Sequence, residues 1–176
     1  MVNVMKRVMS YLEINPERLL LEWVSAAEGA RFAQVVTDFT QKVRELGPLS
    51  SEGESDAQGL RFKLKAARNA LGGEKLRWVA AKQTEFKIDG NKYGEVFTSH
   101  EIGRYLDGVI LEEIIFQQIL LILQHETLSV KEISSKLQLN PSDTFKYVMS
   151  LLRKEMVEVS DTRGRSPLYC LSNTEA

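Results

Sequence analysis

Few side chains in this sequence have the type and spacing that catalysis or metal binding requires. The two histidines, His100 and His125, lie far apart, and neither belongs to a Cys-x-x-Cys or His-x-x-x-His pattern. The single cysteine, Cys170, excludes an internal disulfide and is expected to be a small buried apolar residue. We find no nucleophile with a base, no phosphate loop and no paired carboxylates in a credible context. The sequence therefore predicts a chain that lacks catalytic and metal-binding residues.

The composition describes a globular protein with balanced charge. Hydrophobic residues make up 43% of the 176 residues, which is enough for a core. The sequence contains 23 Lys plus Arg and 24 Asp plus Glu, so its net charge is -1. This charge gives no general attraction to nucleic acids or anionic membranes. The first residues contain no continuous apolar run, so we expect neither a signal peptide nor a membrane span. A cytoplasmic protein is predicted.

The secondary structure predicted for the start of the chain, which would position any functional residue there, is a helix, a strand and a second helix. Residues 1–13 have the pattern of a helix end, and the mostly apolar run 18–24 suits a buried strand. Ser25 and Glu28 have capping-box spacing, which predicts the start of a helix that ends before Pro48. A single strand needs neighbours, so we expect this fragment of an α/β layer to be completed by another sheet.

The middle of the chain predicts a linker, a basic helix, a hairpin and a connecting helix. Residues 49–58 have the composition of an exposed linker, and 60–71 form a basic amphipathic pattern. For this helix, a solvated basic face over a packed apolar one is favoured over phosphate binding. Residues 76–97 surround a turn signal and predict a hairpin. The capping-box spacing of Thr98 and Glu101 opens the connecting helix, where His100 is expected to be solvated or capping rather than a ligand.

The C-terminal part predicts a winged helix-turn-helix domain. Residues 110–124 are apolar enough for a buried helix, and capping-box spacing opens a short helix over 130–137. A turn then leads to a helix over 141–156, and 157–171 can form the hairpin called the wing. Helical spacing predicts that Phe145 is buried and Thr144 exposed.

Six residues of this domain would contact nucleic acid if it binds DNA. They are Thr144, Lys146, Tyr147 and Lys154 on the second helix and Arg163 and Arg165 on the wing. Asp143, Glu155 and Glu158 dilute the basic charge, and no basic run strengthens it. A protein-contact or structural role is therefore favoured over sequence-specific DNA binding.

The N-terminal residues resemble a known family. Residues 18–29 (RLLLEWVSAAEG), followed by 31–33 (RFA) and 46–48 (LGP), look like the C-terminal part of the delta subunit of methyl-viologen-reducing hydrogenase. In that family the subunit passes electrons, through a two-iron cluster held by cysteines, between a hydrogenase or other dehydrogenase and the flavin subunit of heterodisulfide reductase. The resemblance covers about the first quarter of the chain. Residues 90–95 and the C-terminal domain resemble an extension found in longer members.

The departure from the family concerns its cysteines, which lie upstream of this segment and have no counterpart here. The resemblance therefore implies an iron–sulfur cluster and a flavin only in partner polypeptides, with no cofactor bound by this chain. Two explanations remain open. Either the chain is the second half of a split or truncated product that docks on a separately made first half, or it is a docking remnant that has lost electron transfer.

These observations predict an α+β protein with segments 1–48, 49–109 and 110–176. The leading hypothesis is an accessory or docking subunit of a hydrogenase/heterodisulfide-reductase-type complex, bound to the flavin subunit or to the missing cysteine-bearing half. The expected contact residues are Trp23, Ser25, Ala26, Glu28 and Gly29, for which core packing, helix capping and close packing are the alternative roles. The alternative function is a winged-helix DNA-binding regulator, and a homodimer suits either hypothesis.

Overall fold

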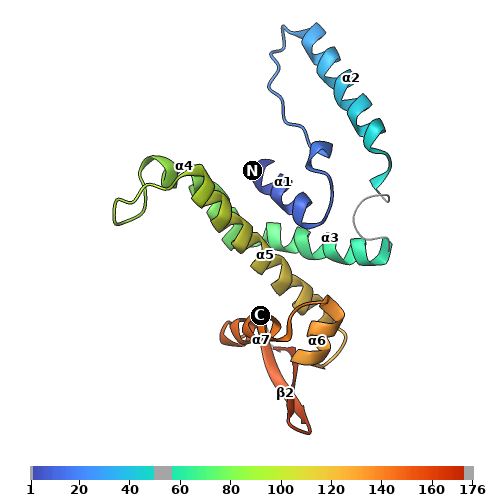
Figure 1. Cartoon of the computed structure of the whole chain (residues 1–176), viewed down its shortest axis with the longest axis vertical. Helices are drawn as coiled ribbons and strands as arrows, with labels where there is room; N and C mark the ends of the chain where they lie inside the picture. The colour runs from blue at the N-terminus through green and yellow to red at the C-terminus, as the bar shows by residue number, and fades with distance from the viewer. Residues whose placement is uncertain (1, 50–56, 173–176) are drawn as a thin grey trace. The chain divides into compact units, whose positions relative to one another are not determined.

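The computed structural model describes residues 2–49 and 57–172, so most of the linker expected at 49–58 lies outside the described residues. The chain divides into two compact units, Met1–Leu64 with Arg77–Asp107, and Lys65–Leu76 with Gly108–Ala176. Figure 1 shows a chain rich in helices with one small sheet, which confirms the α+β class. In the described ranges, no helix combines the length and the apolar character needed to cross a membrane.

Three helices supply residues to both units because the division falls within them. α3 (Ala57–Gly72) confirms the predicted basic helix. α5 (Ser99–Leu123) is one continuous helix where two consecutive helices were predicted, and the bonds between Thr98 and Glu101 form the expected capping box at its start. The third of these helices is α4 (Glu74–Ile88).

α4 shows that the hairpin predicted over 76–97 is wrong. Its sequence, EKLRWVAAKQTEFKI, is dominated by good helix formers, and Leu76 and Val79 are buried one turn apart. The turn signal that follows is real, because Gly90 has a φ of 75° and the Asn91 amide donates to the Glu95 carbonyl at 2.9 Å. The local sequence therefore predicted the turn correctly, but it did not predict the helix before the turn or the absence of a strand in the described residues after it.

The first unit begins with α1 (Val2–Tyr11), the short 3-10 helix η1 (Pro16–Arg18) and α2 (Gly29–Leu46). α1 buries Val4 and Val8 and ends at Tyr11, so the helix end predicted within residues 1–13 is confirmed. The Arg7 guanidinium donates to the Gly103 carbonyl at 3.1 Å and pairs with Asp107, both on α5. Gly103 permits this approach, since a Cβ there would meet the guanidinium at 2.7 Å.

The strand predicted at 18–24 is also wrong. Residues 19–25 run extended between η1 and α2, but no strand of the described residues pairs with them. The three strands that the structure contains there, β1 to β3, all belong to the second unit. A strand needs hydrogen-bonding neighbours, and the apolar run alone could not supply them.

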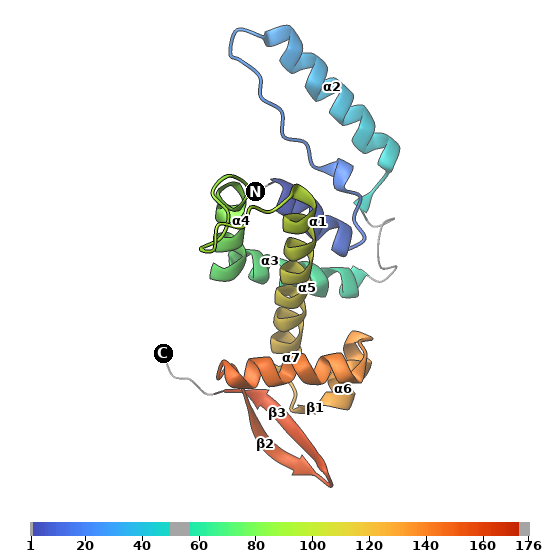
Figure 2. The ribbon, with the colours of Figure 1, turned by 60° about the vertical axis from the view of Figure 1, so that its left-hand side comes forward.

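The second unit joins the end of α5 to a pair of short helices and a hairpin. Its remaining elements are, in chain order, β1 (Leu128–Ser129), α6 (Val130–Leu137), α7 (Pro141–Arg153), β2 (Val157–Arg163) and β3 (Ser166–Leu171). The sheet has the order β1-β3-β2, with both pairs antiparallel (Figure 2). These elements were predicted, apart from β1. The exposure predicted within α7 is reversed, because Thr144 is fully buried and its hydroxyl donates to the Asn140 carbonyl, while Phe145 is half exposed.

The core of this unit is a continuous apolar cluster. It consists of Ile115, Phe116, Ile119, Leu123, Leu128, Ile133, Val148, Leu151, Val157 and Tyr169. Helix α6 is fixed at its start by the predicted capping box, in which the Glu132 carboxylate accepts from the Ser129 amide at 2.8 Å. The Asn140 side chain accepts from the Ser142 amide, and Pro141 occupies the first turn of α7.

The capping box of α6 makes the stability of the second unit depend on pH. Hydrogen bonds from the Ser129 amide and hydroxyl, with a smaller contribution from Arg163, hold the pKa of Glu132 below its usual 4.5. A lowered folded-state pKa gives stability that is fully present above pH 4.5 and is lost as pH falls through the folded value. We expect Glu132→Gln to be less stable than the wild type near neutral pH and the difference to shrink below pH 4.5, measured by urea denaturation. A difference that stays constant down to acidic pH contradicts this account.

Candidate partner-contact site

Three exposed apolar residues of the first unit lie close together in residues 19–28, which we call the 19–28 loop. The side chain of Trp23 is 83% exposed, and Leu20 and Leu21 are also exposed. Burial was the other role considered for Trp23, and the described residues do not provide it. Large aromatic side chains are costly to leave in water, so this loop presents apolar surface that the described residues do not cover.

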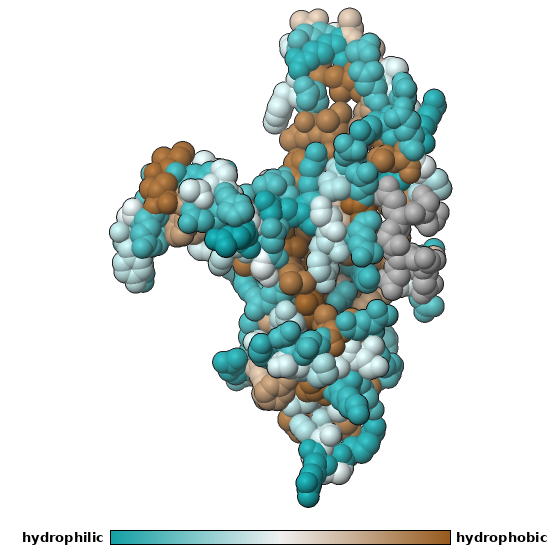
Figure 3. Space-filling model, in the orientation of Figure 1, coloured by the Kyte–Doolittle hydropathy of each residue, from teal (hydrophilic) through white to brown (hydrophobic). Residues whose placement is uncertain are grey.

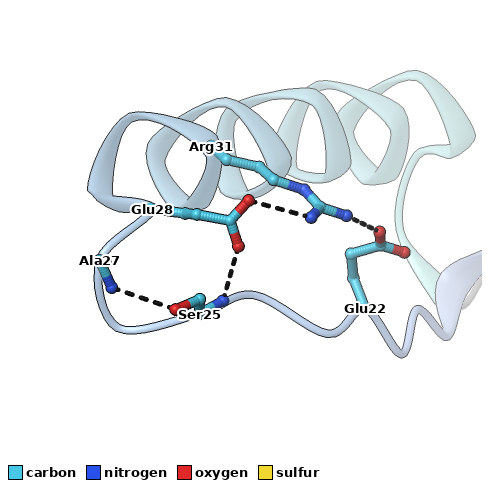
Figure 4. Close-up of polar contacts among 5 residues, drawn as sticks. All are labelled: Glu22, Ser25, Ala27, Glu28 and Arg31. Atoms are coloured by element: carbon cyan, nitrogen blue, oxygen red, sulfur yellow. Dashed lines mark hydrogen bonds and ion pairs between the residues drawn. The ribbon is translucent and has the colours of Figure 1, made fainter.

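A polar network fixes the far end of the loop against α2 (Figure 4). The Arg31 guanidinium pairs with Glu22 at 2.8 Å and with Glu28 at 3.3 Å. The Glu28 carboxylate accepts from the Ser25 amide at 2.9 Å, and the Ser25 hydroxyl accepts from the Ala27 amide at 3.4 Å. These bonds give the loop a defined shape although it has no strand partner.

The helix after the loop begins later than predicted. α2 starts at Gly29, and Glu28 is its N-cap without a side-chain capping bond to the helix. Only the Glu28 half of the predicted capping box forms, because the Ser25 hydroxyl closes a local turn instead. Ala26 and Gly29 are exposed, and a Cβ at Gly29 would meet nothing within 4 Å. Close packing against the described residues, the alternative role considered for Gly29, therefore does not explain why a glycine occupies this position.

α2 is an amphipathic helix whose apolar side is only partly covered by the described residues. None of its 18 residues is buried; Phe32 is 59% exposed and Val36 is 46% exposed. With the 19–28 loop it borders a groove lined by Leu20, Glu22, Val24, Phe32, Val35, Val36, Phe39 and Thr40. Figure 3 shows apolar side chains along the opening between the loop and the helix. Helices of this length gain most of their stability from burying such a face, so the groove has the character of an interaction surface.

The other end of α2 is held by η1. The Arg18 guanidinium donates to the Leu46 carbonyl at 3.1 Å and to the Gly47 carbonyl at 2.8 Å. Lys42 on α2 pairs with Glu17 at 3.1 Å. A cation at the last carbonyls of a helix satisfies acceptors that have no partner within the helix and favours the helix dipole.

This clamp leads to a prediction about helix stability. We expect Arg18→Ala to lower the local free energy of opening of α2 by about 1–2 kcal/mol, because two carbonyls lose a charged donor. Hydrogen–deuterium exchange of residues 29–46 measures the change. Arg44→Ala is the matched control, since Arg44 lies in the last turn of the same helix but has no side-chain bond among the described residues. Equal loss of protection in both variants contradicts a specific role for Arg18.

In the second unit, most of the residues expected to contact nucleic acid already have intramolecular partners. Lys146 pairs with Asp143 at 2.8 Å, which raises the pKa of the lysine. Arg163 pairs with Glu132 at 2.8 Å. The ammonium of Lys154 lies 4.4 Å from the centroid of the Phe116 ring, and the Tyr147 ring packs edge-on against the same ring at 6.0 Å. Thr144 has no exposed surface for a base, while Arg165 is exposed and Lys146 and Arg163 stay exposed in their ion pairs.

The described residues offer no metal site. None of them belongs to a group of three or more His, Cys, Asp or Glu that could hold an ion. Cys170 lies partly buried in β3, with its sulfur 3.8 Å from a Glu158 oxygen.

Comparison with known proteins assigns the loop and α2 to one family. Residues 1–47 match the family model of methyl-viologen-reducing hydrogenase, delta subunit. This delta-subunit-like segment, residues 1–47, therefore contains the 19–28 loop, the groove and the network around Arg31. No solved structure matches the chain.

Curated relatives carry the same stretch in two kinds of chain. The chain is 43% identical over 49 residues to the iron-sulfur subunit of the F420-non-reducing hydrogenase of Archaeoglobus profundus, covering 28% of this chain and 36% of that protein. It is 39% identical over 51 residues to a subunit of the ferredoxin:CoB-CoM heterodisulfide reductase of Methanosarcina mazei, covering 29% of this chain and 6% of that protein. The corresponding protein of Methanosarcina acetivorans is 37% identical over 51 residues. The match spans only about a third or less of each relative.

The residues of this chain do not fit the family's two-iron cluster. Such a cluster takes four ligands, in most proteins all cysteine thiolates. The 176 residues contain one cysteine, Cys170, and it lies outside the delta-subunit-like segment. We therefore derive no electron-transfer step through this chain.

Two features of the site could not be found in the sequence. The Arg18 clamp joins residues 28 and 29 positions apart, and nothing local signals it. The uncovered face of α2 has the same periodicity as a buried helix face, so the pattern could not show that it is exposed. The ion pair between Arg31 and Glu28 could have been predicted from the sequence, because i,i+3 spacing of opposite charges favours contact on a helix.

Proposed function

We propose that this chain is an accessory subunit of a hydrogenase/heterodisulfide-reductase-type electron-transfer complex and that it docks through the 19–28 loop and the apolar face of α2. The observation that carries the proposal is the exposed apolar surface of the delta-subunit-like segment, in which Trp23 of the 19–28 loop is 83% exposed. An exposed tryptophan and an open apolar groove are each typical of an interaction surface.

The relatives support the choice of partner. The same stretch of about 50 residues occurs in a protein named as an iron-sulfur subunit of a hydrogenase and in proteins named as subunits of heterodisulfide reductases. A stretch that occurs in chains of different kinds behaves as a separable module. The partner we propose is a flavin subunit of the heterodisulfide-reductase type, or a polypeptide that carries the cluster cysteines. Cluster and flavin then belong to the partners, and this chain contributes contacts.

Within this proposal the second unit is a winged helix-turn-helix domain with a protein-contact or structural role. In its support, a tight turn joins α6 to α7, the β2–β3 hairpin follows directly, and β1 adds a third strand beside β3. Two of its cations, Lys146 on α7 and Arg163 on the hairpin, are paired with carboxylates of the same unit. These pairs reduce the positive surface available to phosphates.

The test is purification of the tagged chain from its own organism, followed by mass spectrometry and visible absorption spectra. We expect a flavin or iron–sulfur subunit to co-purify with the wild type and to be lost with Trp23→Asp. The proposal is contradicted if the wild-type chain is recovered alone. It is also contradicted if the same subunits co-purify with the wild type and with Trp23→Asp.

A DNA-binding regulator is the alternative, and exposed Arg165 on the hairpin is the observation that favours it. A mobility-shift titration with genomic fragments distinguishes the two functions. We expect no binding beyond that of random duplex at physiological salt. A retained specific complex, lost with Arg165→Ala, supports the regulator instead.

A further inference from the structure

A second pocket of the first unit lies away from the delta-subunit-like segment in sequence. Its walls come from α4, from the turn after α4 and from the first two turns of α5. The lining residues are Trp78, Phe86, Asn91, Phe97, Glu101, Ile102 and Tyr105, and the volume is about 330 Å³. This volume is near the lower end for ligand pockets, so it suits a single side chain rather than a large cofactor.

Four of the lining residues are aromatic, and three of them meet edge-on in two pairs. The Trp78 and Phe86 centroids are 6.1 Å apart with the planes at 68°, and those of Phe86 and Phe97 are 6.2 Å apart at 78°. Trp78 and Tyr105 remain 52% and 57% exposed, so the rings do not complete a closed core. Rings that meet edge-on present faces in several directions, and a cation binds well to such faces.

One carboxylate belongs to the pocket lining, that of Glu101, which is exposed and interacts electrostatically with Arg104 and His100 outside the lining. One oxygen of Glu101, Oε2, accepts from the Thr98 amide at 2.8 Å and from the Thr98 hydroxyl at 2.7 Å. Its other oxygen, Oε1, has no hydrogen-bond partner in the described part of the chain. No lysine or arginine is among the lining residues, and the Asn91 side chain is used by the backbone of Tyr93 and Glu95 and by the Glu95 carboxylate.

We propose that this aromatic pocket binds the guanidinium group of an arginine side chain from a partner protein. Aromatic faces attract cations, and a planar guanidinium stacks on rings better than an ammonium does. The Glu101 carboxylate supplies the opposite charge at the pocket wall, and it is the only charged side chain among the seven lining residues. A neutral aromatic or aliphatic group would fill the same space but would gain nothing from this charge.

The test uses the full chain and two short peptides, Ac-Gly-Arg-Gly-amide and the same peptide with citrulline in place of arginine. Citrulline has nearly the shape of arginine without the charge. The chain contains two tryptophans, so in a Trp23→Phe background the fluorescence reports Trp78 alone. We expect the arginine peptide to change this fluorescence with a Kd of roughly 1 mM and the citrulline peptide to bind at least about fivefold more weakly.

Two matched variants assign the effect to the carboxylate. Glu101→Gln keeps a residue that can serve in a capping box but removes the charge, so we expect about fivefold weaker binding of the arginine peptide with helicity unchanged. Glu132→Gln makes the same change in the capping box of α6, which is no part of this pocket, and should leave the affinity as it was.

Three results overturn the proposal. They are equal affinity for the two peptides, unchanged affinity in Glu101→Gln, and no fluorescence change up to about 20 mM peptide. All are measured on this chain without the redox partners. A negative result here therefore does not contradict the proposed docking function. A negative result for the docking function does not contradict binding at this pocket either.

Discussion

Replacing Trp23 with alanine should weaken binding of this chain to the partner proposed above by about 2–4 kcal/mol, a factor of roughly 30 to 700 in Kd, and leave the fold intact. The side chain is 83% exposed in the free chain, so its removal creates no cavity. Substitutions at such positions change stability by about 0.5 kcal/mol or less. The large effect on binding and the small effect on folding together define an interface anchor.

The physical reason for the size of this effect is the area that Trp23 can bury. A tryptophan buries about 150–250 Å² when it is covered, and an anchor of this kind contributes more than the residues around it. The loop that carries Trp23 is already ordered by the bonds around Arg31 and Glu28. Because the loop does not have to be fixed on binding, little entropy is lost there.

The measurement is a titration of the partner identified by co-purification, by calorimetry or by surface plasmon resonance. Tyr93→Ala is the control, because Tyr93 is an aromatic residue of the same unit, 75% exposed and outside the delta-subunit-like segment. Equal loss of affinity in both variants would mean that exposed aromatic surface in general, rather than this loop, drives association. A Trp23→Ala protein that unfolds would place Trp23 in a core.

The structure shows which sequence signals carried reliable information. Ser129 with Glu132 and Thr98 with Glu101 predicted helix starts because both partners of a capping box lie within four residues and their bonds need nothing from the rest of the fold. The helix predicted from residue 141 begins there, at Pro141, because proline suits the first turn of a helix. The third box was less reliable, because only the Glu28 half forms and the Ser25 hydroxyl closes a local turn instead.

Signals that depend on distant partners were less informative. The apolar run 18–24 predicted a buried strand, but neither burial nor pairing can be read from a run of side chains, and the segment is an exposed loop. Residues 76–88 contain enough aromatic and branched residues to resemble a strand, yet their helix formers prevailed. The buried face of α7 is shifted by one residue from the predicted face. Thr144 is therefore buried and Phe145 half exposed, the reverse of the prediction.

The candidate site was predicted in part. The family resemblance and the residues around Trp23 directed attention to the correct stretch, since the family match covers residues 1–47. The reason given for docking was an unpaired strand, and that reason is wrong. The structure supports docking on different grounds, namely an uncovered amphipathic helix and an exposed loop beside it. Whether Trp23, Ser25, Ala26, Glu28 and Gly29 contact a partner stays a prediction.

The core of the second unit gives the second large expected effect. Leu151 on α7 is fully buried and belongs to the continuous apolar cluster that joins α5, α6, α7 and the sheet. Leu151→Ala removes most of this side chain and leaves a cavity that the surrounding side chains fill only in part. We expect the free energy of unfolding of the second unit to fall by about 2–5 kcal/mol. For a unit of this size, that is a large share of the total stability.

The readout must report the second unit, and both tryptophans, Trp23 and Trp78, lie in the first. Hydrogen–deuterium exchange of β2, β3 and α6 is therefore preferred to tryptophan fluorescence, with urea unfolding followed by circular dichroism as a second measure. Leu111→Ala is the matched control, because Leu111 belongs to α5 and is 37% exposed. Its loss should cost about 1 kcal/mol or less, because the side chain is not packed on all sides. If the two variants lose protection equally, the second unit does not fold around the cluster that contains Leu151.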